Sequence, residues 1–176
     1  MKREGFIERA DTMPTWINYQ TEYLRSGRND AKFFGLTKSN RRIYLARTLH
    51  KGYYVPGYAV DGVGYFVSKK LQPFQTKNFQ VLTGMEVEFS KCHEKGIAAV
   101  ERDKTRYLIG SFCIEDKRFC GLVLDNIICC INFDGKIYTK EAPDFEFIAK
   151  KSHRVRRGGL KMKENSRLNV ERLARK

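Results

Sequence analysis

Residues 42–67 read RIYLARTLHKGYYVPGYAVDGVGYFV, and this stretch determines the fold class. Three short runs rich in β-branched and aromatic residues lie along it, at 42–48, 53–60 and 64–68, the last of which ends one residue beyond the quoted stretch. Short segments with glycine separate the runs, and Asp61-Gly62 is a standard turn dipeptide. Because apolar runs joined by such turns are typical of β-hairpins, the stretch predicts consecutive antiparallel strands.

The same pattern continues toward residue 149. Further predicted strands cover 79–82, 85–89, 107–112, 118–124, 127–133 and 145–148. No stretch within 40–149 keeps a helical period over ten residues, so the sequence predicts an all-β fold. Residues 15–39 fit either a loop with one strand or a helical turn.

The predicted strands repeat in order. Residues 43–48 align with 106–111, 56–61 with 119–125, 64–67 with 128–131, and 78–82 with 144–148. The offset between these blocks drifts from 63 to 66 residues, as expected for a duplicated β unit with small loop insertions. We therefore predict an N-terminal extension at 1–15, a two-repeat β domain at 16–149 and a tail at 150–176. The first repeat covers about 16–83 and the second about 84–149.

The blocks also match a known pattern. In the first repeat they are Trp16, YLAR at 44–47, PGYA at 56–59 and FQVL at 79–82. In the second they are Phe89, YLIG at 107–110, CGLV at 120–123 and FEFI at 145–148. Over residues 16–149 this order resembles the DM-nine repeat family, which comprises invertebrate lectin-like tandem repeat proteins.

The resemblance implies two tandem, intertwined antiparallel β repeats and non-catalytic binding of mannose-type sugars. In the family a lysine follows the turn glycine, whereas this chain has Tyr58 and Leu122 there. An apolar substitute leaves sugar hydroxyls without a hydrogen-bonding partner, so we expect a weakened or lost sugar site. The candidate ligand pocket consists of Arg47, His50, Tyr58 and Asp103.

Positive charge is concentrated at the C-terminus. The chain has 34 Lys and Arg against 20 Asp and Glu, a net charge of +14. Residues 150–176 contribute +9 of this, with eleven Lys and Arg against two Glu, and good helix formers from Lys163 allow one short helix. The candidate partner-binding residues are Arg154, Arg156, Arg157, Lys161, Lys163 and Arg167.

An excess of this size favours an acidic partner. A protein assembly or filament surface such as a microtubule is the leading prediction, and RNA is the competitor. Lys69, Lys70, Phe74 and Lys77 interleave basic and aromatic side chains, a pattern that suits single-stranded nucleic acid.

Other classes of function find little support. No apolar run reaches the length of a membrane-spanning helix, so we expect no membrane partner. The N-terminus has no apolar secretory core and the cysteine count is odd. These features predict an intracellular protein of the cytoplasm or cytoskeleton, with Cys129 and Cys130 reduced in the core.

Catalytic and metal signatures are equally weak. The three histidines, His50, His93 and His153, accompany no nucleophile elbow. Cys92, His93, Cys113 and Cys120 lack metal-ligand spacing, so we interpret these cysteines as structural core. The sequence thus predicts a protein without enzymatic activity, cofactor or metal. It is either a lectin-like scaffold repurposed as a component of a larger assembly or, as the alternative, a mannose-type lectin.

Overall fold

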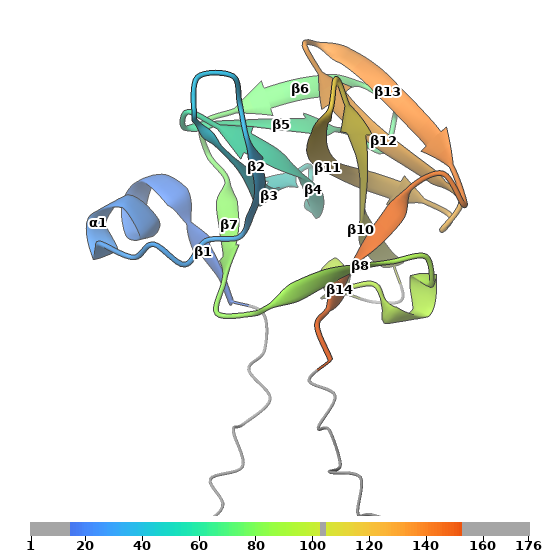
Figure 1. The fold of residues 1–176 in the computed structure, drawn as a ribbon, viewed down its shortest axis with the longest axis horizontal. Coiled ribbons are helices and arrows are strands. Elements are labelled where there is room, and N and C mark those ends of the chain that lie inside the picture. The colour runs from blue at the N-terminus through green and yellow to red at the C-terminus, as the bar shows by residue number, and fades with distance from the viewer. Residues whose placement is uncertain (1–14, 103–104, 153–176) are drawn as a thin grey trace, which may run out of the picture.

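The computed structural model describes residues 15–102 and 105–152. Over these residues the chain forms two antiparallel sheets of seven strands each, which confirms the all-β prediction (Figure 1). The described helical segments are the π-turn at Tyr19–Tyr23, α1 (Leu24–Ser26) and a 3-10 turn at His93–Lys95. None of the helical segments in the described ranges is long and apolar enough to cross a membrane.

The first sheet is built from one continuous half of the chain. Its strands are β1 (Thr15–Asn18), β2 (Phe33–Leu36), β3 (Arg42–His50), β4 (Tyr53–Val60), β5 (Val63–Val67), β6 (Pro73–Thr76) and β7 (Gln80–Thr83). They lie in the order β1-β7-β3-β4-β5-β6, and β2 pairs with β3 off this path.

The second sheet repeats this arrangement. Its strands are β8 (Val87–Ser90), β9 (Ala98–Arg102), β10 (Thr105–Ile114), β11 (Lys117–Leu124), β12 (Ile128–Phe133), β13 (Lys136–Glu141) and β14 (Glu146–Lys150). Their order is β8-β14-β10-β11-β12-β13, with β9 paired to β10. Each strand therefore occupies the place of the strand seven before it, and the two sheets share one topology.

Not every strand follows from the sequence pattern. The nine predicted runs correspond to β3, β4, β5, β7, β8, β10, β11, β12 and β14. Within 40–149, β6, β9 and β13 were not predicted. Residues 15–39 form both of the alternatives that the sequence left open, since they contain β1 and β2 as well as the helical turns.

Cross-strand register corrects one block of the internal alignment. Ala46 lies opposite Gly57 in the first sheet, and Gly110 lies opposite Gly121 in the second. A Cβ on Gly57 would come 2.2 Å from the carbonyl oxygen of Tyr65, and one on Gly121 would come 1.9 Å from that of Cys130. In both sheets the backbone of the next strand lies too close to the glycine for a side chain, so Gly57 and Gly121 occupy equivalent positions. Ala46 then matches Gly110, one residue beyond the sequence alignment.

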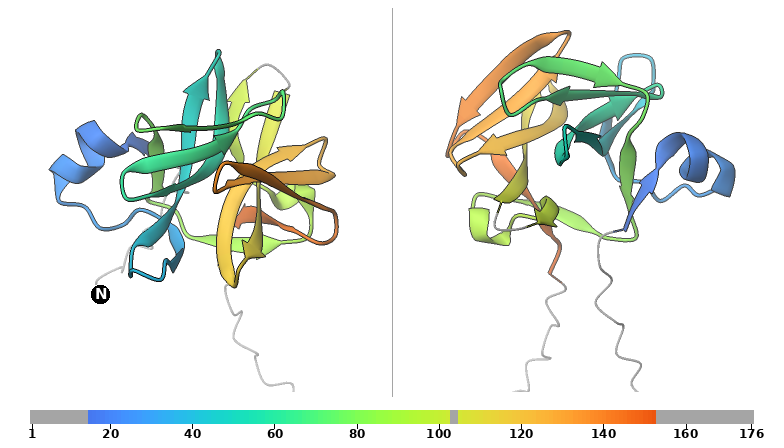
Figure 2. Two further views of the ribbon diagram at one scale, coloured as in Figure 1. Left: turned by 90° about the horizontal axis from the view of Figure 1, so that it is seen from above. Right: turned by 180° about the vertical axis from the view of Figure 1, so that it is seen from behind.

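The two sheets lie next to each other (Figure 2). Side chains from both sheets pack together in shared core clusters. The ring of Tyr58 lies 4.8 Å from that of Phe119, and its hydroxyl donates to the carbonyl oxygen of Asn132 at 2.6 Å. The side-chain Nδ2 of Asn132 in turn donates to the carbonyl oxygens of Phe66 at 3.2 Å and Phe74 at 3.0 Å. The repeats thus interlock at a shared core, while each sheet uses only strands of its own half.

The cysteines divide into two groups. Cys120, Cys129 and Cys130 are buried and free, which confirms the prediction that Cys129 and Cys130 belong to the core. Cys92 and Cys113 are free but exposed, so their interpretation as core residues was wrong. Cys92 follows the short strand β8. Cys113 lies in β10 between the buried residues Phe112 and Ile114, and because successive strand residues face opposite sides of a sheet, its side chain is on the exposed face.

Candidate functional site

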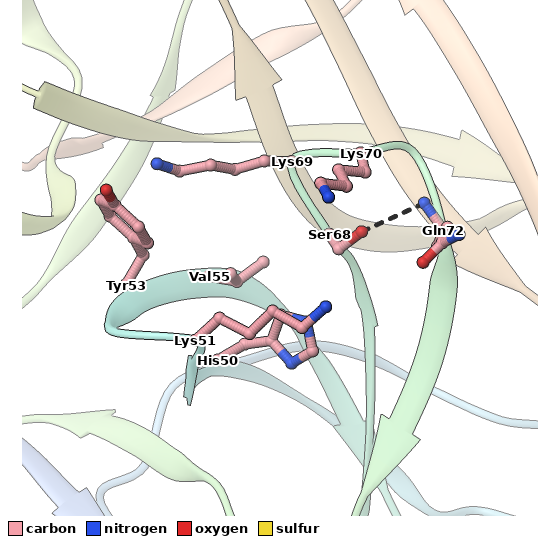
Figure 3. Close-up of a pocket in the computed structure, with 8 residues that line it drawn as sticks. All are labelled: His50, Lys51, Tyr53, Val55, Ser68, Lys69, Lys70 and Gln72. Carbon is pink, nitrogen blue, oxygen red and sulfur yellow. Dashed lines mark hydrogen bonds between the residues drawn. The ribbon is translucent and has the colours of Figure 1, made fainter.

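A cavity of about 150 Å³ lies where two connections of the first sheet meet. These are the β3–β4 turn and the loop between β5 and β6 (Figure 3). The residues that line the cavity come from these two segments and the adjoining strand ends: His50, Lys51, Tyr53, Val55, Ser68, Lys69, Lys70 and Gln72.

Local backbone structure fixes the lysines at the rim. Lys51 and Gly52 have φ of 49° and 84°, the positive values that a tight two-residue hairpin turn requires. In the other segment, the Ser68 amide donates to the Gln72 carbonyl at 2.9 Å, and the Gln72 amide donates to the Ser68 hydroxyl at 3.2 Å. The closed loop therefore presents Lys69 and Lys70 beside the hairpin turn.

Aromatic rings around the cavity are already engaged. The Lys69 ammonium lies 3.0 Å from the ring centroid of Tyr53 and 4.9 Å from that of Tyr107, and Figure 3 shows its side chain reaching toward Tyr53. The His50 ring stacks on Phe74 at 4.3 Å. One face of each aromatic ring is thus occupied within the chain.

Lys69 stays charged in this position. Burial opposes the charged amine, but hydrogen bonding and attraction from Tyr107 and Tyr53 outweigh it, so the pKa of Lys69 lies above its ordinary value. A raised pKa keeps the ammonium protonated at neutral pH. Lys69 therefore contributes a positive charge to the rim at neutral pH.

The lining combines apolar walls with positive charge. Its ionisable groups include three lysines and one histidine but no carboxylate. Val55 is buried at the wall. A void of about 150 Å³ holds one benzene-sized group. The geometry suits a ligand that offers one apolar group flanked by negative charges.

The corresponding end of the second sheet differs. Its β10–β11 turn is Glu115-Asp116, and its β12–β13 turn is Asp134-Gly135. Both turns carry acidic residues, and the second is three residues shorter than the 68–72 loop. The basic cavity is therefore a property of the first sheet alone within the described residues.

Two of the four predicted pocket residues lie elsewhere in the fold. The Arg47 guanidinium lies 4.7 Å from the Trp16 ring and 4.1 Å from the Tyr54 ring, and it donates to the Gln80 side chain at 2.8 Å. Burial lowers the pKa of Arg47 to about 10. Tyr58 is a core residue, and burial raises the pKa of its hydroxyl.

Of the remaining candidates, only His50 lines the basic cavity. Asp103 lies outside the described residues, as do the tail residues Arg154, Arg156, Arg157, Lys161, Lys163 and Arg167. The sequence pattern pointed to Lys69, Lys70 and Phe74 but missed Lys51. The signal for Lys51 was the Lys-Gly turn, which becomes informative only when strand pairing places it beside residues 68–72.

A second, polar pocket of about 190 Å³ lies at the opposite end of β3. Its lining consists of Tyr19, Asn40, Arg41, Arg42, Tyr44 and Asp61. Arg41 and Asp61 form an exposed ion pair at 3.3 Å within it. The pocket thus combines aromatic rings with hydrogen-bonding groups of both kinds.

Comparison with known proteins gives a structural likeness. It concerns the crystal structure of the nematode sperm cell motility protein MFP2B, with a TM-score of 0.51 and 16% sequence identity. The two share a fold. The match covers 71% of this chain and 41% of that protein, so this chain corresponds to less than half of MFP2B. No family model and no curated protein matches the sequence.

Proposed function

We propose that this protein is a non-enzymatic structural component of a larger assembly that binds an acidic protein surface, such as a filament, through positive charge. The observation that carries the proposal is the cavity rim, where Lys51, Lys69 and Lys70 gather around apolar walls without a lining carboxylate. The basic residues 150–176 add a further +9. The fold shared with a motility protein supports a structural role. The scaffold is that of a divergent DM-nine repeat protein.

The described residues offer little for chemistry. Among them no group of three or more His, Cys, Asp or Glu side chains is arranged to hold a metal ion. Burial raises the pKa of the Cys120 thiol to about 12, which is opposite to the shift that activates a nucleophile. These features favour binding over catalysis.

The test uses an acidic pentapeptide with a central isoleucine between glutamates, labelled for fluorescence anisotropy. We expect the full chain to bind it with an affinity that falls as salt rises, because salt screens exposed charges. A Lys51→Glu/Lys70→Glu variant and a chain truncated after Ser152, which keeps the whole of β14, should each bind more weakly and with a smaller salt dependence. Lys38→Glu/Lys136→Glu, which makes the same charge change at two exposed positions, a turn and the start of β13, is the control. An affinity that does not depend on salt, or that falls equally in the control, would contradict the proposal.

The nature of the natural partner is tested by affinity capture from native lysate, with and without nuclease. A defined set of nuclease-resistant proteins whose recovery depends on Lys51 and Lys70 supports the proposal. Recovery that disappears with nuclease would instead identify RNA as the partner and contradict it.

A second candidate, mannose-type sugar binding, is favoured by the polar pocket at Asn40, Arg41 and Asp61. Sugars bind in shallow sites that supply hydrogen-bond donors and acceptors beside an aromatic face, and Tyr19 and Tyr44 provide such faces. A mannan pull-down that free mannose reverses and that Asp61→Ala abolishes would establish this candidate. Absence of retention on mannan would exclude it.

A further inference from the structure

The loop between β11 and β12 presents an apolar side chain close to acidic residues, which is the combination that the basic cavity suits. It consists of Asp125, Asn126 and Ile127, three residues where the first sheet uses the two-residue turn Asp61-Gly62. Ile127 is 55% exposed. Its backbone is nevertheless fixed, because its amide donates to Leu124 at 2.9 Å and its carbonyl accepts from Ala142 at 2.8 Å. The loop therefore holds an apolar side chain out from the sheet.

Acidic side chains surround this loop. Asp125 is part of it, Glu141 lies opposite Ile128 in the β12–β13 ladder, and the Asp144 amide donates to Glu141 at 2.8 Å. None of the three carboxylates forms an ion pair with a described residue. Two cations lie near, but the Lys91 ammonium is bound by the carbonyls of Pro143 and Phe145, and that of Lys140 lies over the Phe112 ring.

Ile127 is distinct among the exposed apolar residues of the described ranges. The other large ones, Leu24, Phe33, Leu36, Leu49, Tyr53, Leu71, Phe89 and Tyr138, each have a Lys or Arg within two positions in the sequence. Ile127 has none and has Asp125 instead. On a chain with a net charge of +14, an apolar residue in an acidic setting is thus the exception.

We propose that the basic cavity receives the Ile127 loop of a second copy of this chain. The inference rests on the proposed function, since it names the acidic partner of the same cavity. The Ile127 side chain is smaller than the benzene-sized space, and Asp125 and Glu141 meet Lys51 and Lys70 at the rim. Because residues 50–72 alone line the cavity, the chain's own loop does not fill it.

The proposed contact joins two different surfaces, the cavity of the first sheet and the loop of the second. Such a contact is heterologous, so any two joined copies still have one free cavity and one free loop between them, and further copies add head to tail.

The test is sedimentation velocity of the purified, nuclease-treated full chain at about 50 mM salt, where surface charges are weakly screened. We expect oligomers that grow with protein concentration and dissociate as salt rises. A cavity variant, Lys51→Glu/Lys70→Glu, and a loop variant, Asp125→Lys/Glu141→Lys, should each sediment as monomers. Mixed together they should form a heterodimer and nothing larger, because only one intact cavity and one intact loop remain to pair.

Two exposed residues provide a matched control for the apolar contact. Ile127 and Leu24 are both 55% exposed. Ile127→Ala should weaken self-association by about tenfold or more through lost apolar burial, while Leu24→Ala should leave it unchanged. Equal effects of the two substitutions would overturn the proposal.

Three further results would also overturn it: a wild-type chain that is monomeric at every soluble concentration, variants that do not form the heterodimer, or oligomers that nuclease treatment removes. Failure here is separable from failure of the proposed function. A monomeric chain that still binds the acidic pentapeptide through Lys51 and Lys70 would contradict head-to-tail association and leave the acidic-partner function standing.

Discussion

In the first sheet the β3–β4 turn is Lys51-Gly52 and the β5–β6 loop is the five residues 68–72, whereas the second sheet has Glu115-Asp116 and Asp134-Gly135 at the equivalent places. At the opposite end the difference reverses, since the second sheet has the longer loop, 125–127, in place of Asp61-Gly62. The strand order of the two sheets is the same. The repeats therefore differ in charge and length at their connections, which are the segments that carry binding in many folds.

A subtler difference concerns the arginines that pack on the outermost strands. Each sheet places an arginine over an aromatic ring of its outermost strand, Arg47 over Trp16 in β1 and Arg118 over Phe89 in β8. Arg47 comes from β3 and bonds to the neutral Gln80, whereas Arg118 comes from β11 and bonds to Glu146 at 3.0 Å. The arginine that packs on the outermost strand therefore comes from different positions in the two sheets, since β11 is the equivalent of β4 and not of β3. Its hydrogen-bonding partner is neutral in the first sheet and negatively charged in the second.

The largest expected effect concerns what the two sheets have in common. A Cβ at Gly121 would lie 1.9 Å from the Cys130 carbonyl oxygen, so Gly121→Ala should lower the free energy of unfolding by about 3 kcal/mol. Gly57→Ala should have a comparable effect. Gly35, where an added Cβ would meet no atom within 4 Å, is the control, and Gly35→Ala should stay within about 0.5 kcal/mol. Urea denaturation measures the unfolding free energy of all three variants. If Gly121→Ala left this free energy unchanged while Gly57→Ala lowered it, the two glycines would not be structurally equivalent.

The next effect separates the two ends by charge. Lys51→Glu/Lys70→Glu should weaken binding of the acidic pentapeptide by about tenfold or more, since it replaces attraction by repulsion at the rim. Glu115→Lys/Asp116→Lys, on the second sheet, should not weaken it. Anisotropy titrations at one salt concentration compare the two variants. Equal losses would mean that the cavity is not the binding site.

A smaller effect tests the connection between the sheets. Tyr58→Phe removes the donor to the buried Asn132 carbonyl at 2.6 Å and should cost about 1 kcal/mol of stability. Tyr65, whose ring stacks on Tyr58 at 5.2 Å, is the matched control. Tyr65→Phe should change the unfolding free energy by less than Tyr58→Phe. The reverse order would show that the hydrogen bond does not hold the sheets together.

The smallest expected effect is a difference in thiol reactivity, which is measured on the folded protein and concerns the second sheet alone. All five cysteines lie between residues 92 and 130, in the second half of the chain. Burial raises the pKa of Cys120 to about 12 and that of Cys129 well above its ordinary value. Because the thiolate is the reactive form, these thiols stay protonated and inert at pH 8, and raising the pH to about 9 should not expose them. A thiol-specific chromogenic reagent should therefore titrate Cys92 and Cys113 first. Rapid reaction of a third thiol would contradict the burial of this core.

The sequence predicted the central strands and missed the edge strands β6, β9 and β13, for a physical reason that β6 and β13 illustrate. Strands such as β4 and β11 are buried on both faces and read as continuous apolar runs, whereas β13 is largely exposed and has the polar sequence KIYTKE. β6 begins at Pro73, which reads as a strand breaker although an edge strand tolerates it. The repeat was visible from its blocks, but only cross-strand pairing fixed the register of β3 against β10.

The candidate site was harder to predict than the fold. Arg47 and Tyr58 stood in the motif blocks but serve packing, because their neighbours in space are aromatic rings and a buried carbonyl. The cavity instead depends on two separate connections that meet only in the folded sheet. Spacing along the chain does not encode that meeting, and Lys51 therefore stood out only in three dimensions.

Recognition of an acidic partner by the basic cavity can be observed residue by residue in a ¹⁵N-¹H NMR titration of the full chain with the acidic pentapeptide. We expect saturable shifts of the amides of Lys51, Gly52 and residues 68–72, with those of Glu115 and Asp116 unchanged. If the first-sheet amides stay unmoved while the peptide binds, the cavity is not the site that recognises an acidic partner.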